Sequence, residues 1–180
     1  MVERIQYSEK QMEALDLNIR RFLYSLIQEA PGLHFRELQR RTKTATGQLT
    51  YHLDYLQKVD LIKTNRSGEF LRFYPSNLND ERIAILKLVR QKSMRHLVLY
   101  LSEKNNCNCE QLVGALHLAP STISWHLGKL IHSKIVEKKS ENKTSVFSIA
   151  CPQLVKQVLL EYQESFMDKL VDQFIEMWEL

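Results

Sequence analysis

The sequence predicts a mainly α-helical fold with small β-hairpins, an α+β arrangement in which one small domain occurs twice. Three observations lead to this prediction. Short segments with helical periodicity follow one another with only brief turns between them, the sequence repeats itself after 74 residues, and a long apolar stripe runs through the last thirty or so residues.

The clearest helical segment runs from Pro120 to Leu130. At 100° per residue, Ile123, Leu127 and Leu130 lie on one face with His126 at its edge. Pro120 suits the first position of a helix, where no backbone N–H is needed. The opposite face is small and polar and carries Ser121, Ser124, Trp125 and Gly128.

The residues around this helix complete a recognisable motif. Cys109–Leu116 is a second, shorter helix, and residues 117–119 leave room only for a tight turn. Two helices joined in this way are typical of a helix-turn-helix unit. The alternating residues around 135–149, split by the polar run 137–144, then predict a β-hairpin, which makes the unit winged.

The same pattern occurs once more, earlier in the chain. Residues 20–73 align with residues 94–147 without a gap. The identical pairs are Arg21/Arg95, Leu23/Leu97, Glu29/Glu103, Leu38/Leu112, Ala45/Ala119, His52/His126, Leu53/Leu127, Leu56/Leu130 and Phe73/Phe147. Because most of these positions are on the predicted core face, two copies of one domain explain the sequence better than a single fold.

The first copy yields a corresponding set of elements. We predict helices over 8–30, 35–41 and 46–58, and a hairpin of residues 61–64 and 70–74 around a turn that contains Gly68. Residues 80–90 are predicted to be helical and to continue, with a bend, into a helix over 94–104. The predicted domains are 1–78, 79–150 and 151–180.

The last domain, 151–180, is predicted to be one helix of about eight turns. Its apolar surface widens after residue 167, and a helix with so much apolar surface needs burial on two sides. We therefore expect homodimerisation across a two-fold axis, with the alternative that the stripe packs back on its own repeats. The expected dimer contacts are Val155, Leu159, Tyr162, Phe166, Leu170, Phe174 and Trp178.

Charge is distributed unevenly along the chain. Residues 1–78 carry 12 Lys/Arg against 9 Asp/Glu, residues 79–150 carry 11 against 6, and residues 151–180 carry 2 against 6. The two repeats are therefore positive and the tail is negative. Positive charge on the part that holds the helix-turn-helix units favours double-stranded DNA, at a promoter or operator, as the partner.

Several classes of protein are disfavoured by the sequence. It holds no run of about 18 apolar residues that would span a bilayer, and its start does not resemble a signal peptide. Three cysteines do not make a disulfide framework, which fits a cytoplasmic location. No phosphate-binding glycine loop, catalytic motif or metal-ligand spacing is present, so we expect neither an enzyme nor a cofactor nor a metal.

The outer faces of helices 46–58 and 120–132 are the predicted DNA-reading surfaces, placed in successive major grooves with the hairpins on the backbone. Small hydroxyl residues and glycine let a helix approach the bases, and basic side chains bind phosphates. The predicted DNA-binding residues are Arg36, Arg40, Arg41, Lys43, Gly47, Gln48, Thr50, Tyr51, Arg66, Ser121, Thr122, Ser124, Trp125, Lys129, Lys138, Lys139 and Lys143.

The two segments TGQLTYHLDYL and PSTISWHLGKL, each in the recognition position of a winged unit, resemble archaeal tandem winged helix-turn-helix transcription regulators of the ArsR/MarR-like group. The resemblance covers roughly residues 15–150. It implies promoter binding, with the helix faces reading bases and the wings touching the backbone or minor groove. The resemblance does not indicate whether the regulator activates or represses, which target sequence it binds or whether it has an effector.

Two alternatives stay open. Tandem winged helices also serve as protein–protein scaffolds in the transcription machinery. The pair Cys107 and Cys109 lies where metal-sensing ArsR-like repressors carry a Cys-x-Cys, which would make the chain a thiol- or metal-responsive repressor. The equivalent residues of the first copy, Leu33 and Phe35, are apolar, so we interpret both cysteines as packing residues.

His52 and His126 occupy equivalent positions at the edge of the core face in the two copies. We expect both to be packed and hydrogen-bonded in a structural role.

Overall fold

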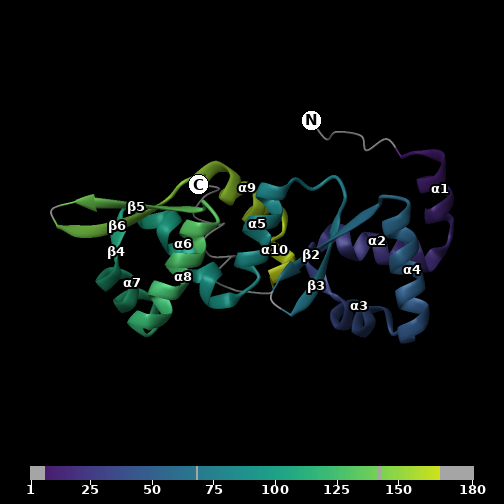
Figure 1. Ribbon diagram of the computed structural model, residues 1–180, viewed down its shortest axis with the longest axis horizontal. Helices are drawn as coiled ribbons and strands as arrows, with labels where there is room; N and C mark the ends of the chain where they lie inside the picture. Colours follow the sequence, from purple (N-terminus) through teal and green to yellow (C-terminus); the bar gives the residue numbers. More distant parts are fainter. Residues whose placement is uncertain (1–6, 68, 142, 167–180) are drawn as a thin grey trace. The chain divides into compact units, whose positions relative to one another are not determined.

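The computed structural model describes residues 7–67, 69–141 and 143–166, and it divides the chain into two compact units, Met1–Ile83 and Ala84–Leu180 (Figure 1). The division falls inside helix α5 (Asp80–Val89). The chain is mostly helical with small antiparallel sheets, as the sequence predicts. The domain limits 1–78, 79–150 and 151–180 stay a prediction.

The first unit is a set of helices followed by a hairpin. Its elements before α5 are α1 (Glu9–Asp16), α2 (Asn18–Glu29), β1 (Leu33–His34), α3 (Phe35–Thr42), α4 (Thr46–Lys58), β2 (Ile62–Ser67) and β3 (Phe70–Pro75). Helix α3, a short turn and helix α4 form the predicted helix-turn-helix, and the hairpin β2–β3 is the predicted wing.

After α5 the second unit repeats the order of elements from α2 to β3, and two helices follow. Its repeated elements are α6 (Lys92–Lys104), β4 (Cys107–Asn108), α7 (Cys109–Leu116), α8 (Pro120–His132), β5 (Val136–Glu141) and β6 (Thr144–Ile149), and the two helices are α9 (Pro152–Glu161) and α10 (Gln163–Phe166). The hairpin β5–β6 is the predicted wing, and its antiparallel pairing continues through most of the polar run 137–144.

Each unit contains a three-stranded antiparallel sheet with the short strand at its edge, in the orders β1-β3-β2 and β4-β6-β5. Leu33 pairs with Phe73 in the first sheet and Cys107 with Phe147 in the second. The two registers differ by the same 74 residues as the sequence repeat. The sequence did not predict β1 and β4, because a strand of two residues has no periodicity to detect.

The duplication extends to backbone conformation. The turns inside the two helix-turn-helix units place Lys43 at φ 53° and His117 at φ 51°. The turns after α4 and α8 place Asp60 and Lys134 both at φ 57°. All four are left-handed residues that few side chains tolerate, so the matching positions confirm that the copies share one chain path.

Helices α4 and α8, the second helix of each helix-turn-helix, supply the centre of the core in their units. In α4, Leu49 and Leu56 have no exposed surface, and in α8 the same is true of Ile123 and Leu130. Residues spaced by three or four lie on one face of a helix, so one stripe is buried and the opposite stripe is left outside.

The expected helix over 8–30 is in fact two helices that meet at Leu17, whose ψ is 120°. The expected run from α5 into the next helix is likewise broken, at Gln91, whose ψ is also 120°. Leu17 and Gln91 are equivalent under the repeat. The prediction was wrong in both copies for the same reason, since apolar periodicity continues across a single extended residue.

An arginine at equivalent positions of the two copies donates a hydrogen bond across each of these breaks. The Nε atom of Arg21 donates to the carbonyl oxygen of Leu15 at 3.0 Å, and Nη1 of Arg95 donates to the carbonyl oxygen of Val89 at 2.6 Å. The acceptors are carbonyls near the end of the preceding helix, which lack a partner within that helix. This bond explains why arginine occurs at both positions.

The C-terminal segment differs from the predicted single helix. Helix α9 ends at Glu161, Tyr162 interrupts it, and α10 is short. Val155, Leu159, Tyr162 and Phe166 are buried within the chain, as the alternative in which the stripe packs back on its own repeat expects. These four side chains therefore do not form an open dimer surface in this structure. Leu170, Phe174 and Trp178 lie outside the described residues.

No helix in the described part of the chain has both the length and the apolar character needed to cross a membrane.

Replacing Leu130 or its equivalent Leu56 by alanine should lower the free energy of unfolding of the unit that holds it by about 2–5 kcal/mol, because both side chains are completely buried. Hydrogen exchange read separately for α2 and α6 measures the loss in each unit. Gln57→Ala, an exposed change on α4, is the control and should stay within about 0.5 kcal/mol. A loss at Leu130 no larger than the control's would contradict the assigned core.

Candidate nucleic-acid interface

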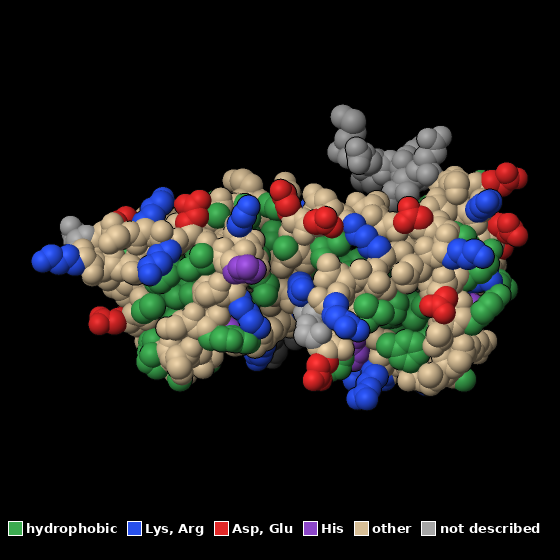
Figure 2. Space-filling view, viewed as in Figure 1, with side chains coloured by type: hydrophobic (Ala, Val, Ile, Leu, Met, Phe, Trp, Pro, Cys, Tyr) green, Lys and Arg blue, Asp and Glu red, His purple; other side chains and the backbone are tan. Residues whose placement is uncertain are grey.

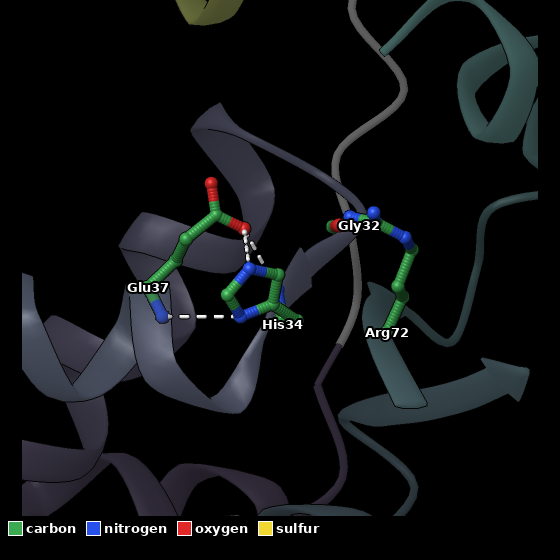
Figure 3. Close-up of polar contacts among 4 residues, drawn as sticks. All are labelled: Gly32, His34, Glu37 and Arg72. Carbon is green, nitrogen blue, oxygen red and sulfur yellow. Dashed lines mark hydrogen bonds and ion pairs between the residues drawn. The ribbon is translucent and has the colours of Figure 1, made fainter. Parts of the chain in front are cut away.

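Each helix-turn-helix begins with a side chain that fixes the start of its first helix. In the first unit Nδ1 of His34 accepts a hydrogen bond from the backbone N–H of Glu37, and the Glu37 carboxylate accepts one from the N–H of His34 (Figure 3). In the second unit Asn108 and Gln111 form the same reciprocal pair. Both capping boxes satisfy otherwise unpaired backbone groups, so α3 and α7 start at equivalent residues.

The loop before α3 is tied to the sheet at two points. Nη1 of Arg72 donates to the carbonyl oxygen of Gly32 at 2.7 Å (Figure 3). The N–H of Gly32 donates to the carbonyl oxygen of Phe73, also at 2.7 Å. Gly32 has a φ of 88°, which favours glycine. The wing strand β3 therefore sets the position of the first helix of the motif.

The turn between the two helices of the motif is closed by backbone bonds. The N–H of Lys43 donates to Gln39, and that of His117 to Val113. In the first unit the amide of Gln39 also donates to the hydroxyl of Thr46 at 2.9 Å, which joins α3 to the start of α4. The angle between the two helices is thus set by short-range contacts.

The outward faces of α4 and α8 are open. Tyr51 is 59% exposed and Trp125, its equivalent under the repeat, is 51% exposed. Such exposure is unusual for large aromatic side chains. The structure places the predicted reading residues of both helices on these faces, and of this group only Thr122 is half-buried.

Two glycines lie on the same faces. Nothing lies within 4 Å of the position that a Cβ would occupy at Gly47 or at Gly128. Packing within the chain therefore does not require glycine at either position. Glycine inside a helix costs about 1 kcal/mol relative to alanine, a cost that applies to Gly128 in the middle of α8, whereas Gly47 is the second residue of α4.

One cation on the second face is already engaged. Nζ of Lys129 lies 3.6 Å from the centroid of the Trp125 ring, close enough for a cation–π interaction. In the first copy the equivalent of Lys129 is Tyr55, and its ring is covered instead by the guanidinium of the buried Arg20, at 3.7 Å. The two recognition faces therefore share a framework and differ in charge.

The predicted phosphate contacts are all exposed. They are Arg36, Arg40, Arg41, Lys43, Arg66, Lys138, Lys139 and Lys143. Lys139 has a weak ion pair with Glu137, with 3.8 Å between Nζ and the carboxylate. Lysine and arginine side chains are interspersed with acidic ones over the face seen (Figure 2), and β5 itself carries the exposed Glu137 and Glu141. Their contact with DNA stays a prediction.

The two wings have different chemistry. Phe70 and Leu71 of the first wing are 47% and 45% exposed, and the Phe70 ring stacks on His34 with 5.2 Å between centroids. The equivalent residues of the second wing are Thr144 and Ser145. The sequence did not predict Phe70 and Leu71 as surface residues, because an apolar pair at the start of a strand indicates burial until its exposure is known.

His52 and His126 are buried beneath these outer faces, as predicted, but the expected hydrogen bonds are not all present. Neither ring nitrogen of His126 has a hydrogen-bond partner among the described residues, and Nδ1 of His52 also has none there. Burial lowers the pKa of both imidazoles, and a neighbouring cation lowers it further, Arg20 for His52 and Lys129 for His126. Burial and the neighbouring cation therefore both favour the neutral form of each imidazole.

The cysteine pair does not form a ligand set. Cys107 is buried on β4 and its Sγ lies 3.8 Å from the carbonyl oxygen of Asn105. Burial raises the pKa of this thiol, which makes the metal-binding thiolate harder to form. Cys109 is half-buried at the start of α7. Within the described residues no three His, Cys, Asp or Glu side chains are grouped so as to hold a metal ion.

Comparisons with known proteins agree with this geometry. Residues 18–86 match a family model described as an N-terminal HTH domain, and residues 91–138 match the arsR family of bacterial regulatory proteins. The chain is 29% identical over 149 residues to an uncharacterised HTH-type transcriptional regulator of Methanocaldococcus jannaschii. That alignment covers 83% of this chain and 37% of the relative, so the chain spans little more than a third of the protein it matches.

The two matches cover both helix-turn-helix units. The chain therefore carries two HTH domains in tandem, and it is homologous to an archaeal protein named as a transcription regulator.

The buried histidines predict how stability depends on pH. Their pKa values are lowered from 6.5 in the folded chain, so below about pH 6.5 the unfolded state binds protons that the native state does not. Stability should be complete above that pH and fall as the pH drops toward 5. Urea unfolding at about pH 7.5 and about pH 5.5 should show a smaller loss in His52→Gln/His126→Gln than in the natural sequence.

The matched control is His132→Gln, a change at an exposed histidine on α8. It should keep the natural pH dependence. Equal pH dependence in the double variant and the natural sequence would contradict the assignment of neutral, buried imidazoles.

Proposed function

We propose that this chain is a sequence-specific DNA-binding transcription regulator that reads DNA with two helices, α4 and α8. The observation that carries the proposal is the matched pair of open faces. At equivalent positions of two HTH domains the chain holds an exposed aromatic ring, Tyr51 or Trp125. Each face also presents a glycine that intrachain packing does not require, Gly47 or Gly128.

In this proposal the small polar residues read base edges. The hydroxyl groups of Thr50, Ser121 and Ser124 can donate to or accept from bases in the major groove, and Trp125 can cover a thymine methyl group. Thr50 already donates to the carbonyl oxygen of Thr46 at 3.0 Å, which leaves its oxygen free to accept from a base. Gln48 and Thr122 flank the two faces.

The basic residues supply affinity without sequence preference. Arg36, Arg40, Arg41 and Lys43 lie in or beside α3, and Arg66 lies on the first wing. Lys138, Lys139 and Lys143 lie on the second wing and Lys129 on α8. Contacts between such side chains and phosphates release counterions, so binding should weaken steeply with salt.

The rest of the proposal concerns the setting. We place the regulator in the cytoplasm, without catalytic activity, and as a homodimer. Because Val155, Leu159, Tyr162 and Phe166 are buried within the chain, the proposed dimer contact uses the apolar residues of 167–180. This part of the proposal rests on the sequence pattern alone.

Salt titration on random duplex DNA tests the DNA-binding proposal against a protein scaffold. We expect binding at low salt with a steep dependence, and a dependence shallower by up to about 0.9 per lost contact in Lys138→Gln/Lys139→Gln/Lys143→Gln. A duplex selected from a random pool should bind more tightly than random DNA, and Ser124→Ala/Trp125→Ala should reduce that ratio. Failure to bind any duplex at low salt would favour the scaffold.

The variant Gly128→Ala distinguishes an effect on DNA affinity from an effect on the stability of the fold. Alanine should stabilise α8 by about 1 kcal/mol, since glycine is the poorer helix former and a Cβ meets nothing. Affinity for the selected duplex should nevertheless fall about tenfold, equal to about 1.4 kcal/mol. Gly114→Ala on α7, where a Cβ also meets nothing, should be stabilised without losing affinity. Unchanged affinity in Gly128→Ala would remove α8 from the groove.

The oligomeric state can be tested with residues of the apolar tail. Sedimentation of the full chain should give a dimer, and Phe174→Ser/Trp178→Ser should give a monomer with the stability of both units unchanged. Gln173→Ser in the same segment is the control and should remain dimeric. A natural chain that sediments as a monomer would reject the homodimer.

A further inference from the structure

A hollow lies in the second unit where helix α6 begins and the turn between α7 and α8 passes. Its volume is about 390 Å³, within the range of small-molecule sites. It is lined by Gln91, Lys92, Ser93, His96, Leu116 and Leu118. None of the residues predicted to touch DNA is among these lining residues.

The lining combines a cationic and an apolar side. Lys92 carries a positive charge and is exposed, and Ser93, His96 and Gln91 add hydrogen-bonding groups. Leu116 and Leu118 supply the apolar side. Because none of these described lining residues is acidic, the hollow favours a small anion with a short apolar body, such as a carboxylate or a phosphate ester.

The position of the hollow connects it to the reading helix. Leu116 is the last residue of α7, and Leu118 follows His117, whose left-handed conformation makes the turn. The next helix, α8, begins at Pro120. A ligand in contact with Leu116 and Leu118 therefore touches both sides of the turn that sets the angle of α8.

The first copy shows that the fold does not require this chemistry. Under the 74-residue repeat, Gln91, Lys92 and His96 correspond to Leu17, Asn18 and Phe22. Leu17 and Phe22 are 47% and 46% exposed in the first unit. The same framework thus folds with an apolar residue in place of Gln91 and of His96 and with a neutral amide in place of Lys92, so the cationic and imidazole groups belong to the second copy alone.

We propose that this hollow binds a small amphipathic anion, a carboxylate or phosphate ester with a short apolar body, and that its occupancy changes the DNA affinity of α8. The second part rests on the proposed function, and the first does not. By linkage, a ligand that alters DNA affinity must have its own affinity altered by DNA to the same extent.

The binding step is tested on the full chain without DNA. Phenyl phosphate is the anionic probe and benzyl alcohol its neutral counterpart, and amide NMR shifts of Ser93, His96 and Leu118 are the readout. We expect saturable shifts with phenyl phosphate only. They should weaken at least tenfold in Lys92→Gln and in His96→Phe, a change that installs the residue of the first copy and is therefore expected to fold.

The control is Lys10→Gln, which removes an exposed lysine from α1 of the other unit. It should bind the probe as the natural chain does. Shifts that are equal for the neutral probe, or unchanged in Lys92→Gln and His96→Phe, would overturn the site.

The regulatory step is tested by titrating the selected duplex with and without saturating phenyl phosphate. We expect a change in DNA affinity of at least fivefold that disappears in His96→Phe. Unchanged affinity would overturn the coupling while leaving the site intact. A backbone phosphate of the duplex has the same anionic chemistry. If DNA displaces the probe competitively and Lys92→Gln lowers the salt slope by about 0.9, the hollow holds DNA phosphate and the small-molecule assignment is overturned.

Discussion

The burial of one face of α4 and of one face of α8 is the constraint on which the rest of this structure depends. Leu53 and Leu127 are each 2% exposed, and Leu49, Leu56, Ile123 and Leu130 are completely buried. A helix has only one face to bury against a single core, so fixing these side chains inside leaves Tyr51 and Trp125 outside. The buried histidines take part in the same constraint, since they lie next to the exposed rings, at 5.3 Å for Tyr51 and His52 and 5.2 Å for Trp125 and His126 between ring centroids.

The duplication works as an internal comparison of two domains with one framework. Strand register, left-handed residues and capping boxes agree between the copies. Surface chemistry does not. The first wing is apolar at Phe70 and Leu71 where the second carries Thr144 and Ser145. Because the frameworks agree, these differences lie in surface side chains that the shared fold does not fix.

The C-terminal segment belongs to the second unit in this structure. Val155, Val158 and Leu159 of α9 have no exposed surface. The Phe166 ring lies 5.0 Å from the guanidinium of Arg95, the arginine that holds the break before α6. Arg95 is accordingly buried, whereas its equivalent Arg21 is exposed although it makes the same backbone bond. Helix α9 therefore adds buried apolar side chains after the hairpin β5–β6, and helix α5 follows the hairpin β2–β3 at the corresponding place.

The sequence by itself determined the duplicated helix-turn-helix framework and which side of α4 and of α8 faces outward. Helices α4 and α7 begin and end where periodicity and turn residues predict, because these signals are local and the apolar stripe leaves one way to bury the helix.

Only the tertiary structure decided the rest. The edge strands β1 and β4, the exposure of Phe70 and the hollow beside Lys92 depend on contacts between segments distant in sequence. The breaks at Leu17 and Gln91 are bridged by arginine bonds that span six residues, and apolar periodicity does not show them. The stripe over 155–166 could have been covered by a second chain or by its own unit, since apolar periodicity states that a face is buried and not what buries it. In this structure these side chains are buried within the chain, and no local pattern encodes that outcome.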